Sequence, residues 1–403
     1  MKTTQSLFII LGLTIFSLNA TAKVAPLPLP EKEWTLLLFL NGHNNLSSFG
    51  DMNLKDMEKT GSTDQVNLVV EWGKSDDVNT HRLLVEKSTD PTKVSSPMIM
   101  SRPNIDMGDS KNFVDFVKWG VRNFPAKHYF VAIWNHGSGW HFQDLLKINS
   151  AIHISDISYD ESSGHHITTE QLGLAMNEIK GIIGHNADIY GSDACLMQMI
   201  EVANEMKESV DYFVGSQETE PGAGWPYETF IKKWTDAPTM TPSEVSVLLS
   251  KEYLKAYSGG VYGQNNVTFA AMDVSKLDAL NRSTAALATQ LKSLSVASLS
   301  KIKAAASVTQ QFFYSDYKDI GDFLKRVDVA GINIDKAVIA QVKTDLSSAI
   351  LTTDNSTSFA AATGLSIWIP ASASDTEMPR YKGLQFDRQA NWSSFLTTML
   401  SAP

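Results

Sequence analysis

Short apolar runs that alternate with amphipathic segments constrain the fold of this chain most. Residues 34–40 have the sequence Trp-Thr-Leu-Leu-Leu-Phe-Leu, and residues 66–72 and 129–134 are of the same kind. Strands without polar alternation are typical of a parallel sheet that is covered on both faces. Between the runs, residues 113–124 carry apolar side chains at helical spacing. The alternation predicts an α/β sandwich with a mostly parallel central sheet.

The same patterns predict the neighbouring elements. Thr168 stands before a helical stretch and Gln171 follows three residues later, which is the spacing of a capping box. We therefore expect a helix over residues 168–183. The other expected elements are a helix at 49–59 and strands at 82–86, 187–190 and 210–216.

Beyond residue 238 the chain becomes mainly helical. Helices are predicted at 241–256, 274–303, 320–327 and 334–351. Apolar stretches at 267–272 and 364–370 predict two strands, which we expect to rejoin or extend the sheet. The chain thus divides into an α/β domain at 34–250 and a mainly helical region at 251–403, with a soft boundary within 235–265.

The N-terminus resembles a bacterial secretory signal. Lys2 is followed by an apolar core at residues 7–18 and by Ala20-Thr21-Ala22, a small-residue cleavage site. We expect residues 1–22 to be a signal peptide and residues 23–33 to be a proline-rich lead-in. No later stretch is long and apolar enough for a membrane span. The mature protein is therefore predicted to be exported, either periplasmic or secreted.

Charge and cysteine content narrow the function. The chain has 34 basic and 44 acidic residues, a net charge of −10, which argues against a nucleic acid as the main partner. Cys195 is the single cysteine, so no internal disulfide can form, and the thiol is a buried bystander, an intermolecular bridge or a reactive group. We expect a monomer.

Cys195 stands where a predicted strand gives way to a predicted helix. Strand 187–190 precedes it, and apolar residues at helical spacing follow it: Leu196, Met199, Ile200, Ala203 and Met206. The first turn of a helix has free N–H groups and a partial positive charge, which lower the pKa of a thiol. The position predicts a reactive cysteine.

His136 follows the strand at 129–134, so it and Cys195 both lie past the carboxyl ends of parallel strands, where sites collect. A histidine is the usual base for a cysteine nucleophile. Gly137 leaves room for a substrate backbone. The N–H group of Gly137 or of Cys195 could hold the oxyanion of a tetrahedral intermediate.

Two sequence blocks carry a family resemblance. Trp-Asn-His-Gly-Ser-Gly-Trp at 134–140 and Asp-Ala-Cys-Leu-Met at 193–197 resemble the signature blocks of the clostripain family of cysteine peptidases. The similarity continues at 44–46, 107–109, 159–162, 216–225, 319–323 and 364–367. The resemblance implies a caspase-like α/β/α fold for the catalytic domain at 34–250. It also implies a cysteine endopeptidase that acts on protein or peptide substrates.

The resemblance also implies roles for individual residues. Cys195 would be the nucleophile and His136 the base or acid. Asp193 would be the acidic wall of a pocket that selects Arg or Lys before the scissile bond, which suits a partly desolvated carboxylate. Residues 216–220, which include Ser216, Gln217 and Glu218, would bind the substrate backbone as an added strand, and Glu218 or Glu220 would add negative charge. Asp193 could also cap the following helix, and the two roles can coexist.

The chain departs from the family at one loop. The family often has acidic residues where His43 and Asn45 stand, whereas Asn44 is kept. The departure puts a role of this loop in substrate or ion binding in doubt. Some family members are activated by cleavage after the histidine strand, which makes Lys147 a predicted self-cleavage site. Calcium stimulation is implied for some members; we expect no other cofactor and no metal ligands.

Two alternatives stay open on the sequence. The chain could be a catalytically silent secreted binding module on the same fold. It could also be a peptidase of different specificity, for acidic or small residues.

Overall fold

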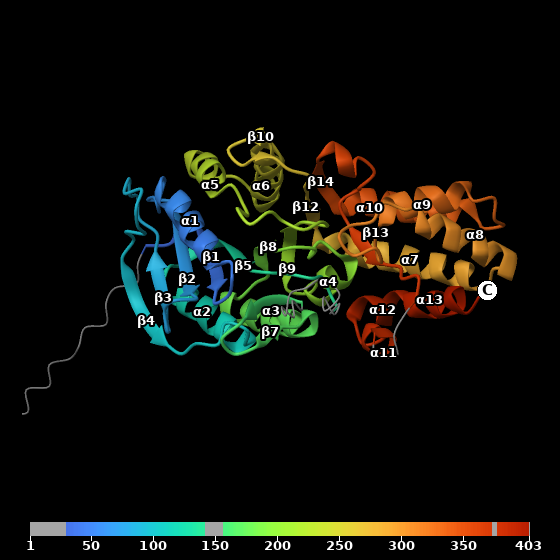
Figure 1. Cartoon of the computed structure of the whole chain (residues 1–403), viewed down its shortest axis with the longest axis horizontal. Coiled ribbons are helices and arrows are strands. Elements are labelled where there is room, and N and C mark those ends of the chain that lie inside the picture. The colour runs from blue at the N-terminus through green and yellow to red at the C-terminus, as the bar shows by residue number, and fades with distance from the viewer. Residues whose placement is uncertain (1–29, 142–155, 373–376, 403) are drawn as a thin grey trace, which may run out of the picture.

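A nine-stranded sheet forms the centre of the computed structural model, which describes residues 30–141, 156–372 and 377–402 (Figure 1). The strand order is β14-β12-β9-β8-β5-β1-β2-β3-β4. In chain order these strands are β1 (Lys32–Gly42), β2 (Val66–Lys74), β3 (Asn79–Leu84), β4 (Met98–Pro103), β5 (Ala126–Trp134), β8 (Ala187–Asp193), β9 (Val210–Gly215), β12 (Thr268–Asp273) and β14 (Ile350–Asn355).

The middle of this sheet is parallel, as the apolar runs predict. Strands β2, β1, β5, β8 and β9 run in one direction, and β3, β4, β12 and β14 add antiparallel edges. The side chains of β1 alternate between two hydrophobic cores, with Leu37 and Phe39 in one and Leu36 and Leu38 in the other. The expected α/β class with a mostly parallel sheet is confirmed.

Helices cover both faces of the sheet. One core takes buried side chains from α2 (Ser110–Asn123), α3 (Thr169–Ile183) and α4 (Ile200–Glu205), and the other from α1 (Ser47–Glu58), α5 (Tyr227–Asp236) and α6 (Pro242–Tyr257). The capping box at the start of α3 is present: the Thr168 side chain accepts from the Gln171 N–H, and the Gln171 side chain accepts from the Thr168 N–H. The boundary expected at residue 250 falls inside α6, which is one continuous helix.

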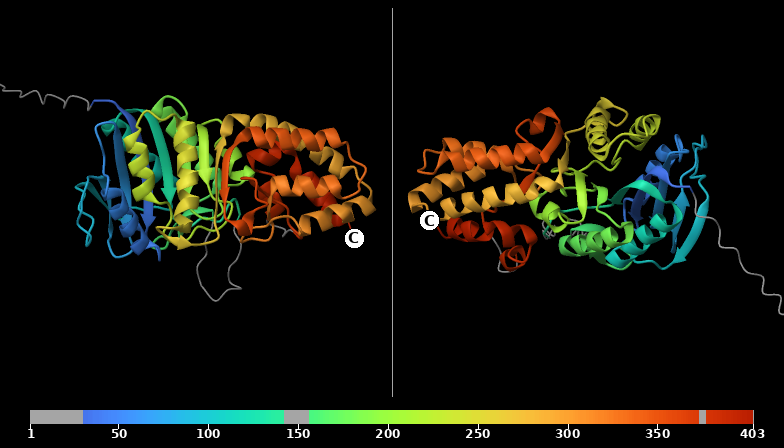
Figure 2. Two further views of the ribbon diagram at one scale, coloured as in Figure 1. Left: turned by 90° about the horizontal axis from the view of Figure 1, so that it is seen from above. Right: turned by 180° about the vertical axis from the view of Figure 1, so that it is seen from behind.

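The C-terminal helices extend from one end of the sheet (Figures 1 and 2). They are α7 (Leu277–Lys292), α8 (Val296–Ser307), α9 (Ile320–Val329), α10 (Lys336–Ala349), α11 (Glu377–Tyr381), α12 (Gln385–Ala390) and α13 (Trp392–Ser401). Their apolar side chains, such as Leu280 and Phe395, belong to the same core as α2 and α3. The helical region therefore shares a core with the α/β part.

Two predictions about this region are wrong. The helix expected over 274–303 is broken, because Ser295 caps a second helix by accepting a hydrogen bond from the Ser298 N–H. The strand expected at 364–370 is β15 (Ser366–Trp368), which pairs with β13 (Tyr317–Asp319) and not with the main sheet. The short remaining elements are β6 (Ile157–Asp160), β7 (His165–Ile167), β10 (Ser258–Gly260), β11 (Gly263–Gln264), η2 (Val274–Lys276) and η3 (Thr357–Phe359).

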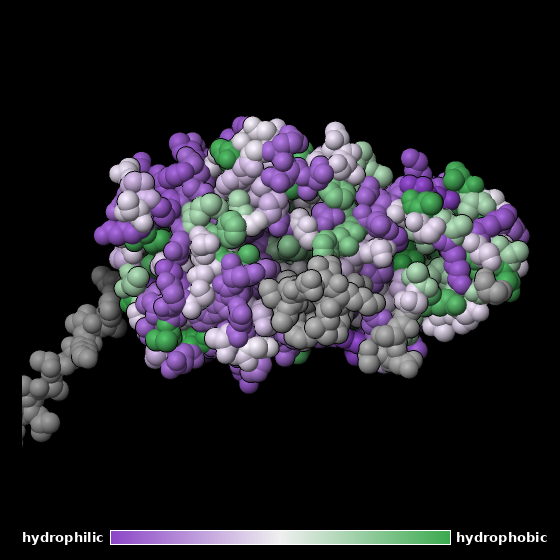
Figure 3. All heavy atoms as spheres, in the orientation of Figure 1, coloured by the Kyte–Doolittle hydropathy of each residue, from purple (hydrophilic) through white to green (hydrophobic). Residues whose placement is uncertain are grey.

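The surface in Figure 3 mixes polar and apolar residues. Within the described ranges, none of the helices has the length and apolar character that crossing a bilayer needs. The predicted signal peptide at 1–22 and most of the lead-in lie outside the described residues.

Candidate active site

One small cavity lies at the carboxyl ends of β5 and β8. His136 is the second residue after β5, and Cys195 is the second residue after β8. Both side chains line the cavity, which has a volume of about 180 Å³. The complete lining is Leu46, Trp134, Asn135, His136, Asp193, Ala194, Cys195, Glu220, Pro221, Gly222 and Gly224. The sheet topology thus brings the two predicted reactive residues into one site.

Cys195 does not start a helix, so that prediction is wrong. Helix α4 begins at Ile200, and residues 194–199 form a loop in which Leu196 has a φ of +67°. The N–H groups of Leu196 and Gln198 donate to the carbonyls of Glu218 and Ser216, at 3.1 and 3.0 Å. These bonds hold the segment alongside the 216–218 loop, and the thiol therefore lies outside the first turn of the helix.

The half-buried Cys195 thiol is held in its neutral form. The Glu220 N–H donates to Sγ at 3.3 Å. Burial raises the pKa of Cys195 to about 11; the Glu220 N–H opposes this, and the charges of Glu218 and Asp193 reinforce it. The thiol is thus protonated at neutral pH in this conformation.

His136 is also neutral at that pH. Its Nε2 lies 2.7 Å from Oδ1 of Asn45. Burial lowers the pKa of His136 to about 4. A neutral imidazole can accept a proton from a neutral thiol, and this is the protonation state that a histidine base requires.

Asp193 and Glu220 are the acidic residues that line the cavity. Asp193 is 4% exposed, and its Oδ2 accepts from the Tyr227 hydroxyl at 2.7 Å and from the Trp225 N–H at 3.3 Å. The alternative role of Asp193 as a helix cap is excluded, because α4 begins at Ile200 and its N-cap is Met199. Burial raises the pKa of Asp193, and burial together with the Asp193 charge raises the pKa of Glu220. Burial thus favours the protonated form of both carboxyls.

Comparison with known proteins identifies the family and the fold. A model of the clostripain family matches residues 38–398. The chain belongs to the clostripain family. Clostripain of Hathewaya histolytica is 23% identical over 254 residues, which cover 56% of this chain and 47% of that protein. The chain therefore spans about half the length of the curated relative that it matches.

Two solved structures of high similarity show the fold of this clostripain-family chain. A secreted C11 cysteine protease from Bacteroides thetaiotaomicron, in complex with an irreversible peptide inhibitor, has a TM-score of 0.70 at 19% identity. An inactive zymogen C11 protease from Parabacteroides distasonis has a TM-score of 0.67 at 17% identity. Each comparison covers 90% of this chain and 99% of the other. The caspase-like fold expected from the sequence is confirmed.

Gly137 lets the two signature blocks pack together. A Cβ at Gly137 would lie 2.5 Å from the Cys195 carbonyl oxygen and 3.1 Å from Cβ of Ala194. The Asn135 N–H also donates to the Asp193 carbonyl at 3.1 Å. Only a glycine permits this close approach of the histidine loop to the cysteine loop.

Residues 216–218 do not form the expected substrate-binding strand. Strand β9 ends at Gly215, and the carbonyls of Ser216 and Glu218 already bond to the cysteine loop. The Ser216 hydroxyl lies 3.0 Å from the Thr268 hydroxyl. In this conformation the backbone of residues 216–218 is engaged within the chain, and pairing with a substrate backbone stays a prediction.

The side chains of Gln217 and Glu218 hold this loop in place. Gln217 donates to Asp319 at 3.1 Å and accepts from the Gly364 N–H at 3.1 Å. Glu218 accepts from the Thr219 N–H at 2.7 Å. Their role is to fix the loop whose continuation, from Glu220 onward, lines the cavity.

One predicted residue lies outside the described structure, and two features of the site were not predicted. Lys147, the predicted self-cleavage residue, lies outside the described residues. Sequence reasoning missed Tyr227 and the contact of Asn45 with His136, because both depend on tertiary packing. In the part of the chain that the structure describes, no group of three or more His, Cys, Asp or Glu residues is arranged to hold a metal ion.

Proposed function

We propose that this chain is an exported bacterial cysteine endopeptidase that hydrolyses peptide bonds after Arg or Lys. The observation that carries the proposal is the shared cavity: a thiol, a neutral imidazole and two buried carboxyls line the same 180 Å³ space. Membership of the clostripain family supports it.

The chemistry follows from these groups. Cys195 Sγ attacks the carbonyl carbon of the scissile bond as its proton passes to His136. His136 then protonates the leaving amine, and a thioester joins Cys195 to the acyl part of the substrate. Water, deprotonated by His136, hydrolyses the thioester and restores the thiol. Backbone N–H groups beside Cys195 and Gly137 stabilise the oxyanion.

Asp193 and Glu220 supply the specificity. A guanidinium or ammonium group in this cavity would favour the charged form of the two carboxyls and pair with it. A neutral side chain could not do so, and an acidic one would add a further negative charge beside them. Substrates with Arg or Lys before the scissile bond are therefore favoured. Peptide hydrolysis by these groups needs no cofactor, and stimulation by calcium stays a prediction.

The test is hydrolysis of fluorogenic peptides that differ only before the scissile bond, with Arg, Lys, Asp or Ala. We expect residues 23–403 to cleave the Arg and Lys peptides, and Cys195→Ala to cleave none while keeping its melting temperature. Assays with calcium and with a chelator decide the cofactor prediction. Cleavage confined to the Asp or Ala peptide would assign a different specificity, and turnover by Cys195→Ala would exclude the mechanism.

A catalytically silent binding module is the second candidate. It is favoured by the raised pKa of Cys195, because burial holds the thiol in its neutral form. An Arg-bearing chloromethyl ketone separates the candidates, because it alkylates a reactive cysteine beside an acidic pocket that accepts the Arg side chain. Stoichiometric labelling of Cys195 supports the peptidase. Absence of labelling, also after nicking of the chain at Lys147, supports the binding module.

A further inference from the structure

The loop between β1 and α1 places Asn45 against His136, the proposed catalytic base. Asn45 is exposed and His136 is half-buried, and 2.7 Å separate Oδ1 of Asn45 from Nε2 of His136. An amide oxygen only accepts hydrogen bonds, so this contact favours the tautomer in which Nε2 carries the proton. The lone pair of the neutral ring then lies on Nδ1, which is the nitrogen left to take a proton from the thiol.

The charge of the partner matters as much as the geometry. A carboxylate in this place would favour the imidazolium and raise the pKa of His136. The neutral amide orients the ring without that effect, in keeping with the lowered pKa of His136. An asparagine is therefore suited to hold a base that must be neutral at the start of the reaction.

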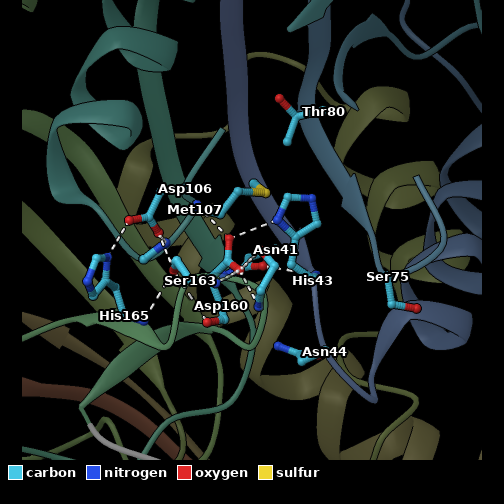
Figure 4. Close-up of polar contacts among 12 residues, drawn as sticks. Asn41, His43, Asn44, Ser75, Thr80, Asp106, Met107, Asp160, Ser163 and His165 are labelled. Carbon is cyan, nitrogen blue, oxygen red and sulfur yellow. Dashed lines mark hydrogen bonds and ion pairs between the residues drawn. The ribbon is translucent and has the colours of Figure 1, made fainter. Parts of the chain in front are cut away.

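Hydrogen bonds to β6 fix the loop that carries Asn45; Figure 4 shows the Asn41, His43 and Asn44 side chains together with Asp160 of β6. The Asn44 side chain donates to the Tyr159 carbonyl at 2.8 Å, and the Asn41 side chain donates to the same carbonyl at 3.2 Å. Asn44 also accepts from the Leu46 N–H at 2.9 Å. The residue on either side of Asn45 is thus tied down.

His43 and Asp160 form the inner support of this loop. His43 Nδ1 lies 2.8 Å from Asp160 Oδ2, and both side chains are buried. Asp160 also accepts from the Met107 N–H and from Ser162. Although burial raises its pKa, the hydrogen bonds of His43, Ser162 and Met107 lower the pKa of Asp160 to about 2.

Asn135, the residue before His136, is held by the same two strands, β1 and β6. The Asn135 side chain donates to the Asn41 carbonyl at 2.6 Å and accepts from the Tyr159 N–H at 2.8 Å. Asn135 directly precedes His136 in the chain. Both partners of the 2.7 Å contact are therefore built on the same framework, which leaves little freedom between them.

We propose that Asn45 is a positioning residue that fixes the Nε2–H tautomer of His136, and that the His43–Asp160 pair supports it. The proposal rests on the proposed peptidase function for its effect on rate.

The kinetic test compares Asn45→Ala, Asn45→Asp and the control Ser48→Ala, an exposed residue of α1. For Asn45→Ala we expect kcat to fall roughly 10- to 100-fold at constant KM, part of the 10² to 10⁴ that positioned proton transfer contributes. For Asn45→Asp we expect the acidic limb of the kcat/KM profile to move to higher pH by about one unit or more, because the added charge raises the pKa of His136. Ser48→Ala should match the wild type.

A spectroscopic test separates this proposal from the peptidase function. In the Cys195→Ala background, the ¹⁵N shifts of His136 should show a single Nε2–H tautomer, and Asn45→Ala should give a mixture. This readout stays decisive if the wild type cleaves no peptide. An unchanged tautomer in Asn45→Ala, or a pH profile of Asn45→Asp equal to that of the wild type, would overturn the proposal.

The support is tested at His43. His43→Asn keeps a donor near the position of Nδ1, so it should retain most of the kcat and the single tautomer of His136. His43→Leu removes the donor and should reproduce the kinetic and spectroscopic effects of Asn45→Ala. If the two variants are equally affected and the tautomer is unchanged in both, His43 serves only the fold and its part of the proposal fails.

Discussion

Replacement of Asp193 by Asn should change activity and stability in opposite directions. The carboxylate is 4% exposed and already has two donors, Tyr227 and the Trp225 N–H. Removing one partner of a buried, hydrogen-bonded charge pair costs about 2 to 5 kcal/mol. At 1.36 kcal/mol for each factor of ten, kcat/KM for an Arg peptide should fall roughly 30- to 5,000-fold.

The stability effect follows from the raised pKa of Asp193. An acid whose folded pKa lies above its unfolded value binds more protons when folded. The destabilisation caused by burying its negative charge is therefore absent below the unfolded pKa and grows as the pH rises toward the folded pKa. Asp193→Asn should raise the melting temperature at pH 8 and leave the difference between the variants small at pH 4.

The assay measures kcat/KM with paired peptides that carry Arg or its neutral analogue citrulline before the scissile bond. Asp193→Asn and Glu220→Gln should each lower the preference for Arg, whereas Tyr227→Phe, which removes one hydroxyl, should keep it. An equal loss for Arg and citrulline, or a lower melting temperature of Asp193→Asn at pH 8, would refute the reasoning.

Three further outcomes are expected. Gly137→Ala should cost about 1 to 3 kcal/mol of stability and most of the activity, because its Cβ would meet the Cys195 carbonyl at 2.5 Å; Gly181→Ala, where the Cβ meets open space, is the control in thermal melts and peptide assays. Burial raises the pKa of Glu201 to about 7, so its stabilising proton is lost as the pH rises through that value. In urea unfolding, Glu201→Gln should therefore reduce the change in the free energy of unfolding between pH 5 and 8 by about 3 kcal/mol. Iodoacetamide at pH 8 should alkylate Cys195 roughly 100-fold more slowly than a free cysteine, since the pKa of the thiol is raised to about 11; an equal rate in a mass-spectrometric time course would contradict that value.

The parallel strands were predictable because burial on both faces leaves an unbroken apolar run in the sequence. The same logic located His136 and Cys195, since the ends of such runs mark one edge of the sheet. Strand β4 (Met98–Pro103) left no such signal: it is an edge strand whose side chains are mostly exposed. Strand β14 was hidden because Ile350–Asn355 directly continues the periodic pattern of α10.

The error at Cys195 has a specific cause. Leu196, Met199 and Ile200 are all 0 to 1% exposed, so their spacing reflects burial. Buried apolar residues three to four positions apart are normally a sign of a helix. Here the same positions are buried in a loop that is hydrogen-bonded to residues 216–218. The pattern therefore reported the core correctly and the backbone conformation incorrectly. Contacts between distant segments, such as Asn45 with His136, leave no periodic signal at all.

The cavity links recognition of the substrate to the state of the nucleophile. The negative charge of Asp193 is among the causes that raise the pKa of Cys195. A basic side chain between Asp193 and Glu220 would offset that charge and ease ionisation of the thiol. A neutral citrulline peptide lacks this effect even when it is bound. The preference for Arg should therefore appear in kcat as well as in KM, because part of the binding interaction acts on the reacting group.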